Sequence, residues 1–391
     1  MTKADKEGQR KAPILRFKGF TDDWEQRKLS DFTHIIVGGT PSTKKNEYWN
    51  GNIPWMSSGE INKKRIYKTD KSITKLGLEN LSAKFVPKNS VLIALAGQGK
   101  TRGKVAINNI ELTINQSLAG LIPTSESYYE FIFYNLEKRY SELRRLSSGA
   151  GSRGGLNKKL IQNIKIQIPD LREQTLISKL SETLDKVLTL YEMKKQLLTQ
   201  LKQGIVNFLI TKNGQKPQLR FIGFNNNWES KSFEKLLNYE QPTKYIVKKA
   251  DYISQGTPVL TANKSFILGY TNETNVYQSI PAIIFDDFTL ESKYVDFPFM
   301  VKSSAIKILT SKNSNLFFIY QLLNNQKFVQ EGHSRHYISV VQKKKVLVPS
   351  IQEQNKIGNL IKQLENSIEQ NSNTITLLKR LKEFLLQNMF L

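Results

Sequence analysis

The sequence contains no cysteine and only three histidines among its 391 residues. The absence of cysteine excludes disulfide bonds, thiolate metal sites and cysteine nucleophiles. The histidines, His34, His333 and His336, are too few and too scattered to predict a metal site, so we expect no metal on this chain. No apolar run approaches the roughly 18 residues of a membrane-spanning helix. The charged N-terminus lacks the apolar core of a signal peptide, so we expect a cytoplasmic protein.

The chain is also short of acidic residues relative to basic ones. It has 58 lysines and arginines against 34 aspartates and glutamates, which gives a formal net charge of +24. An excess of this size attracts polyanions, and nucleic acid is the first partner to consider. Since other classes of protein are equally basic, the charge by itself leaves binding to RNA or to acidic partners open.

Sequence motifs of adenine methyltransferases, nucleotide-binding proteins and nucleases are missing or incomplete. The sequence has no (Asn/Asp)-Pro-Pro-(Tyr/Phe) loop of the kind that an adenine methyltransferase needs. The loop "GQGKTRGK" at residues 97–104 is rich in glycine, but its spacing is not that of a nucleotide-binding P-loop. A near-match to the PD-(D/E)xK nuclease pattern lies in "FDDFTLESK", with Asp286 or Asp287 followed closely by Glu291 and then Lys293. We expect a chain without catalytic residues and keep a solitary nuclease or methyltransferase as an alternative.

The sequence does contain an internal duplication. The phrase "PILRFKGFTDDW" at residues 13–24 returns as "PQLRFIGFNNNW" at residues 217–228. Two more pairs follow in the same order: "IPWMSSG" with "TPVLTAN", and "IPDLREQ" with "VPSIQEQ". Because the segments between these phrases differ in length and sequence, the chain has two similar frames that carry two different inserts.

Each half ends in a long pattern of apolar residues spaced by three and four. We predict that this seam contains Ile177, Leu180, Leu184, Val187, Leu198 and Leu201 in the first half, and Ile357, Leu360, Leu364, Leu378, Leu381 and Leu385 in the second. Heptads sustained in this way are typical of a coiled coil, here with helices of roughly 37 residues and about 55 Å. We predict that the two helices pack antiparallel on each other; the alternative is two amphipathic helices on separate cores.

Short apolar runs between glycine, asparagine and proline residues predict strands in both inserts, with one helix in a matching place in each. The predicted fold is therefore α/β (α+β): two mixed α/β domains separated by a long antiparallel two-helix coiled coil, with a pseudo-two-fold internal repeat. We expect a first domain at residues 1–170, a first spacer helix at 171–212, a second domain at 213–348 and a second spacer helix at 349–391.

Basic and amide residues gather in particular loops of the two inserts. The candidate DNA contacts are Lys44, Lys45, Ser57, Ser58, Gln98, Lys100, Arg102, Lys104 and Arg153 in the first domain, and Thr261, Asn263, Lys264, Arg335 and His336 in the second. We expect the lysines to contact phosphates. Arg102, Gln98, Arg335 and Asn263 are the candidates for hydrogen bonds to base edges. The alternative for each loop is a solvated hairpin tip.

The segment "GGTPSTKKNEYWNGNIPWMSSGEI", the two lead-in phrases, the "IP.L.EQ" helix starts and the paired heptad helices together resemble the specificity (S) subunit of a type I restriction-modification system. The resemblance covers nearly the whole chain, although the second domain keeps only the "TP.LTAN" part of the first motif. It implies two target-recognition domains, each of which reads one half of a bipartite DNA site. Because the inserts differ, that site should be asymmetric.

The resemblance also implies partners and cofactors. It implies assembly with two methyltransferase subunits, which methylate adenine, and with two restriction (translocase-nuclease) subunits. S-adenosylmethionine, ATP and Mg are implied on those partners, and no cofactor on this chain. A basic coiled-coil scaffold that binds RNA or acidic partners is the remaining alternative.

Overall fold

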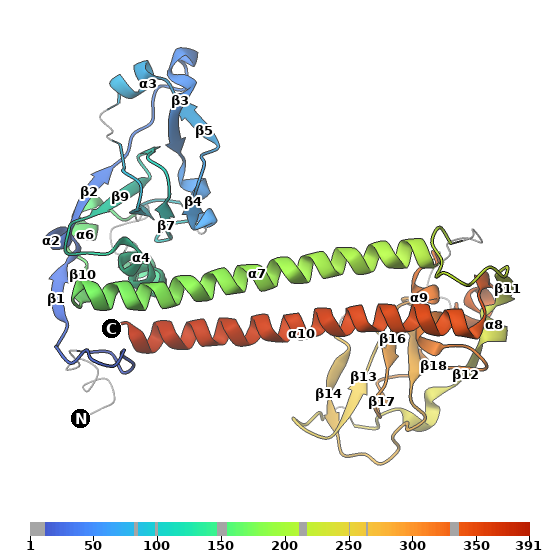
Figure 1. Ribbon diagram of the computed structural model, residues 1–391. Helices are drawn as coiled ribbons and strands as arrows, with labels where there is room; N and C mark the ends of the chain where they lie inside the picture. Colours follow the sequence, from blue (N-terminus) through green and yellow to red (C-terminus); the bar gives the residue numbers. More distant parts are fainter. Residues whose placement is uncertain are drawn as a thin grey trace. The chain divides into compact units, whose positions relative to one another are not determined.

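The computed structural model describes residues 12–81, 85–97, 101–146, 155–210, 217–249, 251–262, 265–328 and 336–391. The chain divides into two compact units, Met1–Tyr191 with Thr374–Leu391, and Glu192–Asn373 (Figure 1). Each unit contains a mixed α/β domain and part of two long helices, so the predicted fold class is confirmed. Our finer division into domains and spacer helices stays a prediction. Within the described ranges, no helix is both long and apolar enough to cross a membrane.

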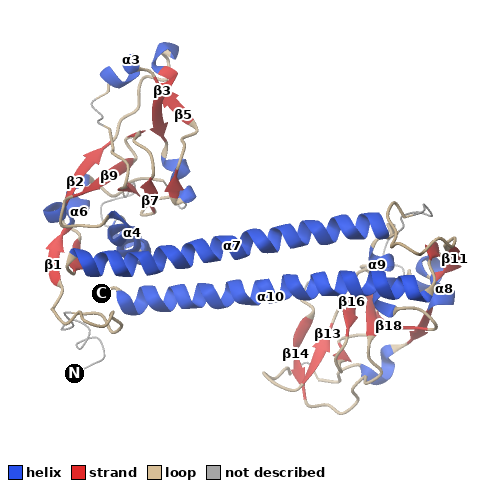
Figure 2. Cartoon of the chain, viewed as in Figure 1, coloured by secondary structure: helices blue, strands red, loops and turns tan. Residues whose placement is uncertain are grey.

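The domain of the first unit is built on two sheets (Figure 2). The larger has the strand order β2 (Thr33–Val37), β9 (Leu118–Pro123), β6 (Ser90–Ala94), β7 (Val105–Asn108) and β4 (Arg65–Ile66). The smaller has the order β5 (Lys71–Ile73), β3 (Trp49–Met56) and β8 (Thr113–Ile114). Helix α4 (Tyr129–Lys138) packs on β6 and β7. The lead-in strand β1 (Glu25–Lys28) pairs antiparallel with β10 (Lys165–Ile168), the strand that precedes the first long helix.

The domain of the second unit repeats this plan. Its larger sheet has the order β12 (Leu237–Glu240), β18 (Ile306–Ser311), β15 (Ala282–Asp286) and β16 (Ser292–Val295). Its smaller sheet has the order β14 (Ile267–Thr271), β13 (Thr257–Leu260) and β17 (Met300–Val301). Helix α9 (Leu316–Asn324) packs on β15 and β16, and β11 (Glu229–Ser232) pairs with β19 (Lys345–Val348). The duplication read in the sequence therefore extends to strand order, except that β4 of the first unit has no counterpart in the described part of the second.

Short helices connect these strands. The first unit contains α2 (Leu29–Phe32), η1 (Asn46–Tyr48), η2 (Ser58–Lys63), α3 (Lys75–Glu79), α5 (Tyr140–Leu146) and α6 (Lys158–Gln162). The second contains α8 (Phe233–Leu236), η3 (Pro242–Tyr245) and η4 (Tyr337–Val341). Helices α6 and η4 occupy the same place in the repeat, directly before β10 and β19.

The two long helices, α7 (Leu171–Leu209) and α10 (Ile351–Met389), have 39 residues each, about 58 Å at 1.5 Å per residue. Within each unit, the start of one helix lies beside the end of the other. Lys382 Nζ donates to Asp185 at 2.6 Å in the first unit, and Lys202 Nζ donates to Glu365 at 2.5 Å in the second. The two ion pairs occupy equivalent repeat positions, and the predicted antiparallel packing is confirmed.

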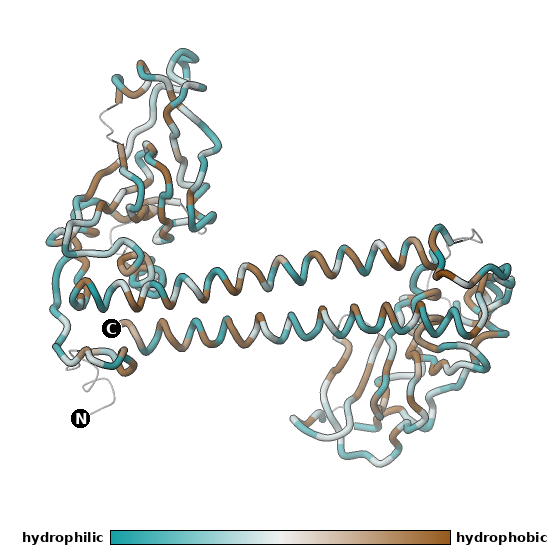
Figure 3. The backbone as a smooth tube through the Cα atoms, in the orientation of Figure 1, coloured by the Kyte–Doolittle hydropathy of each residue, from teal (hydrophilic) through white to brown (hydrophobic). Residues whose placement is uncertain are grey.

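The inward face of the helices follows a different heptad frame from the one we predicted. Its residues are Ile177, Ser181, Leu184, Leu188, Tyr191, Lys195, Leu198, Lys202, Ile205 and Leu209 in α7, and Ile357, Ile361, Leu364, Ile368, Asn371, Ile375, Leu378, Lys382, Leu385 and Met389 in α10. Leu180, Leu201 and Leu381, which we placed in the seam, are exposed, Leu201 by 51%. Both frames step by three and four and share every second residue. Polar residues such as Ser181 and Lys202 lie at inward positions, so the apolar pattern alone did not identify the correct frame. Figure 3 shows apolar segments recurring along both helices.

The end of each long helix completes the core of a domain. Met389 and Phe390 are buried in the first unit, where Phe390 stacks on Phe131 with ring centroids 5.3 Å apart. Lys138 Nζ donates to the Phe390 carbonyl at 2.8 Å. Leu209 and Ile210 are buried in the equivalent place of the second unit. Each domain therefore depends on the helix end that the other half of the sequence repeat supplies.

The duplicated lead-in phrases have a shared structural role at the helix starts. Arg16 donates to both carboxylate oxygens of Glu173 at 2.8 and 2.7 Å, and Arg220 binds Glu353 in the same way at 2.9 and 2.7 Å. These hydrogen bonds raise the pKa of Arg16 and of Arg220 above the ordinary value. Each arginine thus ties the lead-in to the first turn of a long helix.

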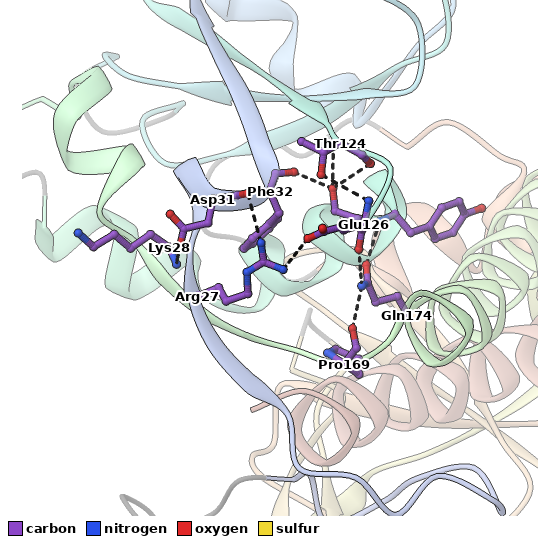
Figure 4. Close-up of polar contacts among 10 residues, drawn as sticks. Arg27, Lys28, Asp31, Phe32, Thr124, Glu126, Pro169 and Gln174 are labelled. Atoms are coloured by element: carbon purple, nitrogen blue, oxygen red, sulfur yellow. Dashed lines mark hydrogen bonds and ion pairs between the residues drawn. The ribbon is translucent and has the colours of Figure 1, made fainter.

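A glutamine in that first turn adds a second tie (Figure 4). Gln174 Nε2 donates to the carbonyls of Pro169 at 2.9 Å and Glu126 at 3.0 Å, and Gln354 Nε2 donates to Pro349 at 2.9 Å. The glutamine fixes the strand-to-helix turn in both units, which explains why the "EQ" pair is part of the repeated phrase.

Candidate nucleic-acid interface

The segment after β2 displays two exposed lysines, Lys44 and Lys45. Lys45 Nζ donates to the Tyr48 hydroxyl at 3.0 Å and stands 5.0 Å from the centre of that ring. The hydrogen bond raises the pKa of Lys45 above its ordinary value. The arrangement presents cations beside an aromatic ring, which suits contact with phosphate.

Ser57 directly follows β3, Ser58 is the first residue of η2, and both are half-buried. The Ser57 N–H donates to Glu60 Oε1 at 3.1 Å, and Ser57 begins η2 as its cap residue. The structure therefore gives Ser57 a local role at the start of η2. Contact of either serine with DNA stays a prediction.

The glycine-rich basic loop is partly described. Gln98, Lys100 and Arg153 lie outside the described residues. Arg102 and Lys104 are half-buried, and Lys104 Nζ donates to Asn62 Oδ1 at 2.6 Å. Gly97 has φ +118, a backbone conformation that favours glycine, which fits a tight turn at the base of the loop.

A further polar hollow on the first unit was not among our sequence-based candidates. It has a volume of about 390 Å³, and its lining includes Asn50, Asn52, Tyr67, Lys68 and Lys71. Tyr67 is 67% exposed. An exposed ring beside two lysines and two amides offers stacking, phosphate contacts and hydrogen bonds to base edges. The alternation of lysine with an aromatic residue in "IYKTDK" was the signal available in the sequence.

In the second unit, the structure describes two of the five predicted contacts. Asn263, Lys264 and Arg335 lie outside the described residues. Thr261 is half-buried, and its N–H donates to the Phe266 carbonyl at 3.0 Å.

The predicted contact through His336 needs correction. The side chain of this residue is buried, with 2% exposure, so it does not face outward. Its backbone N–H donates to the Asp287 carbonyl at 3.2 Å, and its Nδ1 lies 3.4 Å from the same oxygen. These contacts with Asp287 hold His336 in the protein interior, just before η4 begins.

The acidic residues of the nuclease near-match have structural roles. Asp286 Oδ1 accepts the N–H groups of Phe288 and Thr289 at 2.9 Å, which closes the turn after β15. Asp287 forms a buried ion pair with Lys307, whereas Glu291 is exposed. Among the residues that the structure describes, no group of three His, Cys, Asp or Glu side chains is placed to hold a metal ion.

A polar network ties the first domain to its long helices. Lys382 Nζ donates to Asp185 at 2.6 Å and to Glu137 of α4 at 3.2 Å, and the Tyr134 hydroxyl donates to Asp185 at 3.0 Å. Burial favours a raised pKa for Glu137, but Lys382 and Lys64 outweigh it and hold the pKa of Glu137 below its ordinary value. In the second unit, Gln321 takes the place of Tyr134 and Glu365 that of Asp185, and Gln321 donates to Glu365 at 3.1 Å.

Comparisons with known proteins bear on this chain as a whole. The family model described as type I restriction modification DNA specificity domain matches residues 21–203 and 225–380. The chain is 50% identical over 123 residues to the specificity subunit of a type I restriction enzyme from Escherichia coli, a match that covers 29% of this chain and 30% of that protein. It is 23% identical over 405 residues to the type I restriction enzyme MjaIX specificity subunit from Methanocaldococcus jannaschii, covering 94% and 92% of the two chains.

Solved structures show the same fold. The S subunit of a type I restriction-modification system from M. genitalium matches with a TM-score of 0.69 at 16% identity, over 97% of this chain and 99% of that one. A chain from a structure concerned with complex assembly of the type I R-M system matches with a TM-score of 0.51 at 12% identity, over 96% and 98%.

Proposed function

The chain belongs to the family of type I restriction modification DNA specificity domains, and from this we propose that it is the non-catalytic DNA-recognition subunit of a type I restriction-modification complex. We further propose that each unit reads one half of an asymmetric bipartite site. The observation that carries this is one strand order built twice with different loops on it. Two DNA-binding surfaces that differ in their loops but share one strand order suit a target with two unlike half-sites. The net charge of +24 supports DNA as the ligand.

The proposed role of α7 and α10 is to set the spacer between the half-sites. Half-sites that are read from one face of a duplex lie about 34 Å apart, or a multiple of this. Helices of about 58 Å are long enough to span such a distance. The ion pairs between α7 and α10 in both units support a fixed register for the two helices.

We propose that partner subunits bind an exposed apolar stripe on the long helices. In the first unit it contains Leu190, Leu377, Leu381 and Phe384, and in the second Met193, Leu197, Leu201 and Phe208. Leu197 is 62% exposed. Exposed apolar residues repeated along one face of a helix mark an interaction surface. The expected occupants are two methyltransferase and two restriction subunits, which would carry S-adenosylmethionine, ATP and Mg in a cytoplasmic complex.

The test is adenine methylation with and without a methyltransferase partner. The chain and the methyltransferase subunits of the same host are produced separately and together, and methylated adenines are mapped by sequencing. We expect methylation at one bipartite site only when both are present. Methylation or cleavage by the chain alone, or methylation by the pair without a sequence preference, would overturn the proposal.

A further inference from the structure

One buried ion pair distinguishes the second unit from the first. Lys307 Nζ lies 3.4 Å from Asp287 Oδ2, with side chains 1% and 3% exposed. Lys307 also donates to Gln241 Oε1 at 3.2 Å and to the Ser304 carbonyl at 3.4 Å. The equivalent positions of the first unit, one residue after β6 and the second residue of β9, hold Leu95 and Ala119. Burying two charges carries a large desolvation cost, and the first unit keeps the same strand order with apolar residues there. The fold alone does not explain the pair.

Asp287 makes an extra tie to the segment that follows the candidate loop. In both units a backbone N–H donates across to the end of the strand, Leu156 to the Leu95 carbonyl at 2.9 Å and His336 to the Asp287 carbonyl at 3.2 Å. Among the described residues, a carboxylate adds to this contact in the second unit alone, where Asp287 Oδ1 accepts the Tyr337 N–H at 2.7 Å. Lys307 holds the other carboxylate oxygen, so the pair orients the acceptor.

The segment held in this way is η4, a single π-helical turn. The Gln342 N–H donates to the Tyr337 carbonyl at 2.8 Å, and π-helical turns are rare and frequent at functional sites. Tyr337 and Val341 are fully buried, and the Tyr337 ring lies 5.4 Å from the rings of Phe285 and Tyr239. The residues between them, Ile338, Ser339 and Val340, are exposed, Ile338 by 57%. A firmly held turn thus displays a short apolar edge.

The first unit displays different chemistry at the same position. In α6, the exposed residues that correspond to Ile338 and Ser339 are Lys158 and Lys159. Lysines suit phosphate contacts without sequence preference. A β-branched apolar side chain suits the thymine methyl group in the major groove, and a serine hydroxyl can bond to base edges.

We propose that the exposed edge of η4, Ile338 to Val340, is a specificity-determining contact with the second half-site, and that Asp287 and Lys307 are its positioning residues. The inference rests on the proposed function. It predicts that losing the carboxylate tie changes reading of the second half-site and leaves the first half-site unchanged, because Leu95, at the position of Asp287 in the first unit, has no side-chain acceptor.

Two double variants separate positioning from stability. Asp287→Asn with Lys307→Met removes both charges and keeps a side-chain oxygen to accept the Tyr337 N–H. Asp287→Leu with Lys307→Ala also removes both charges but recreates the apolar pair of the first unit and loses the acceptor. Each is purified with its methyltransferase subunits, and bound duplexes are selected from a pool with both half-sites randomised. Thermal unfolding of each complex checks stability.

We expect the Asn/Met variant to keep the wild-type preference at both half-sites. The Leu/Ala variant should discriminate the second half-site about tenfold less well and read the first half-site as before. If both variants keep the second half-site preference, or both lose it equally, the positioning role is refuted. The surface variant Ile338→Ser, which leaves the core intact, should also shift the second half-site, and unchanged selection with it would refute the contact. If the wild-type complex selects no two-part site, it is the proposed function that fails.

Discussion

Shortening the helix pair by one heptad is the most direct test of its proposed role as a spacer. Deleting residues 190–196 from α7 and 371–377 from α10 removes seven residues from each helix. It preserves the heptad frame and both ion pairs, Lys382 with Asp185 and Lys202 with Glu365. Seven residues at 1.5 Å each shorten the pair by about 10.5 Å, which corresponds to about three base pairs at 3.4 Å. We expect recognition of the same half-site bases with a spacer about three base pairs shorter.

The assay is sequencing of methylated adenines after the shortened chain is produced with its methyltransferase partner. A matched control deletes the same seven residues from α7 alone, which offsets the two helices and should abolish methylation. Unchanged spacing in the doubly shortened chain would refute the spacer role, and so would a change in half-site bases without a change in spacing.

Three further predictions follow from the site and the cores. Phe390→Ala should destabilise the first unit by about 3 to 5 kcal/mol, measured by urea unfolding, with Phe384→Ala on the exposed face as a near-neutral control. Because Glu137 has a lowered pKa in the folded state, its ionised form stabilises the fold above pH 4.5, and this stabilisation is lost as the pH falls through the folded pKa. Acid unfolding should show this loss of stability, and the loss should be smaller in the Lys382→Met variant. Leu197→Asp with Leu201→Asp should weaken co-purification with partner subunits and leave thermal unfolding unchanged; full retention of the partners would count against the apolar stripe as their binding surface.

The larger features of this fold were predictable because they are periodic or repeated. The lead-in phrases and the heptads predicted two similar frames and two long helices, since both signals lie within short stretches of sequence. The predicted seam frame was wrong because apolar residues fit both frames. Lys202 and Lys382 can be assigned to inward positions only once their ion-pair partners on the other helix are known. His336 was misplaced because Asp287, distant in sequence, determines its burial. The hollow at Tyr67 was missed because residues from separate segments form it.

The burial of Met389 and Phe390 in the first unit has a consequence for the order in which the protein matures on the ribosome. All residues of the second unit, including Leu209 and Ile210 that close its core, are translated before the residues that close the first. The second unit therefore has all of its residues synthesised at a point when the first still lacks the helix end that closes its core. A chain released before Met389 and Phe390 are added would expose the apolar core of its first unit, which favours proteolysis of the whole chain.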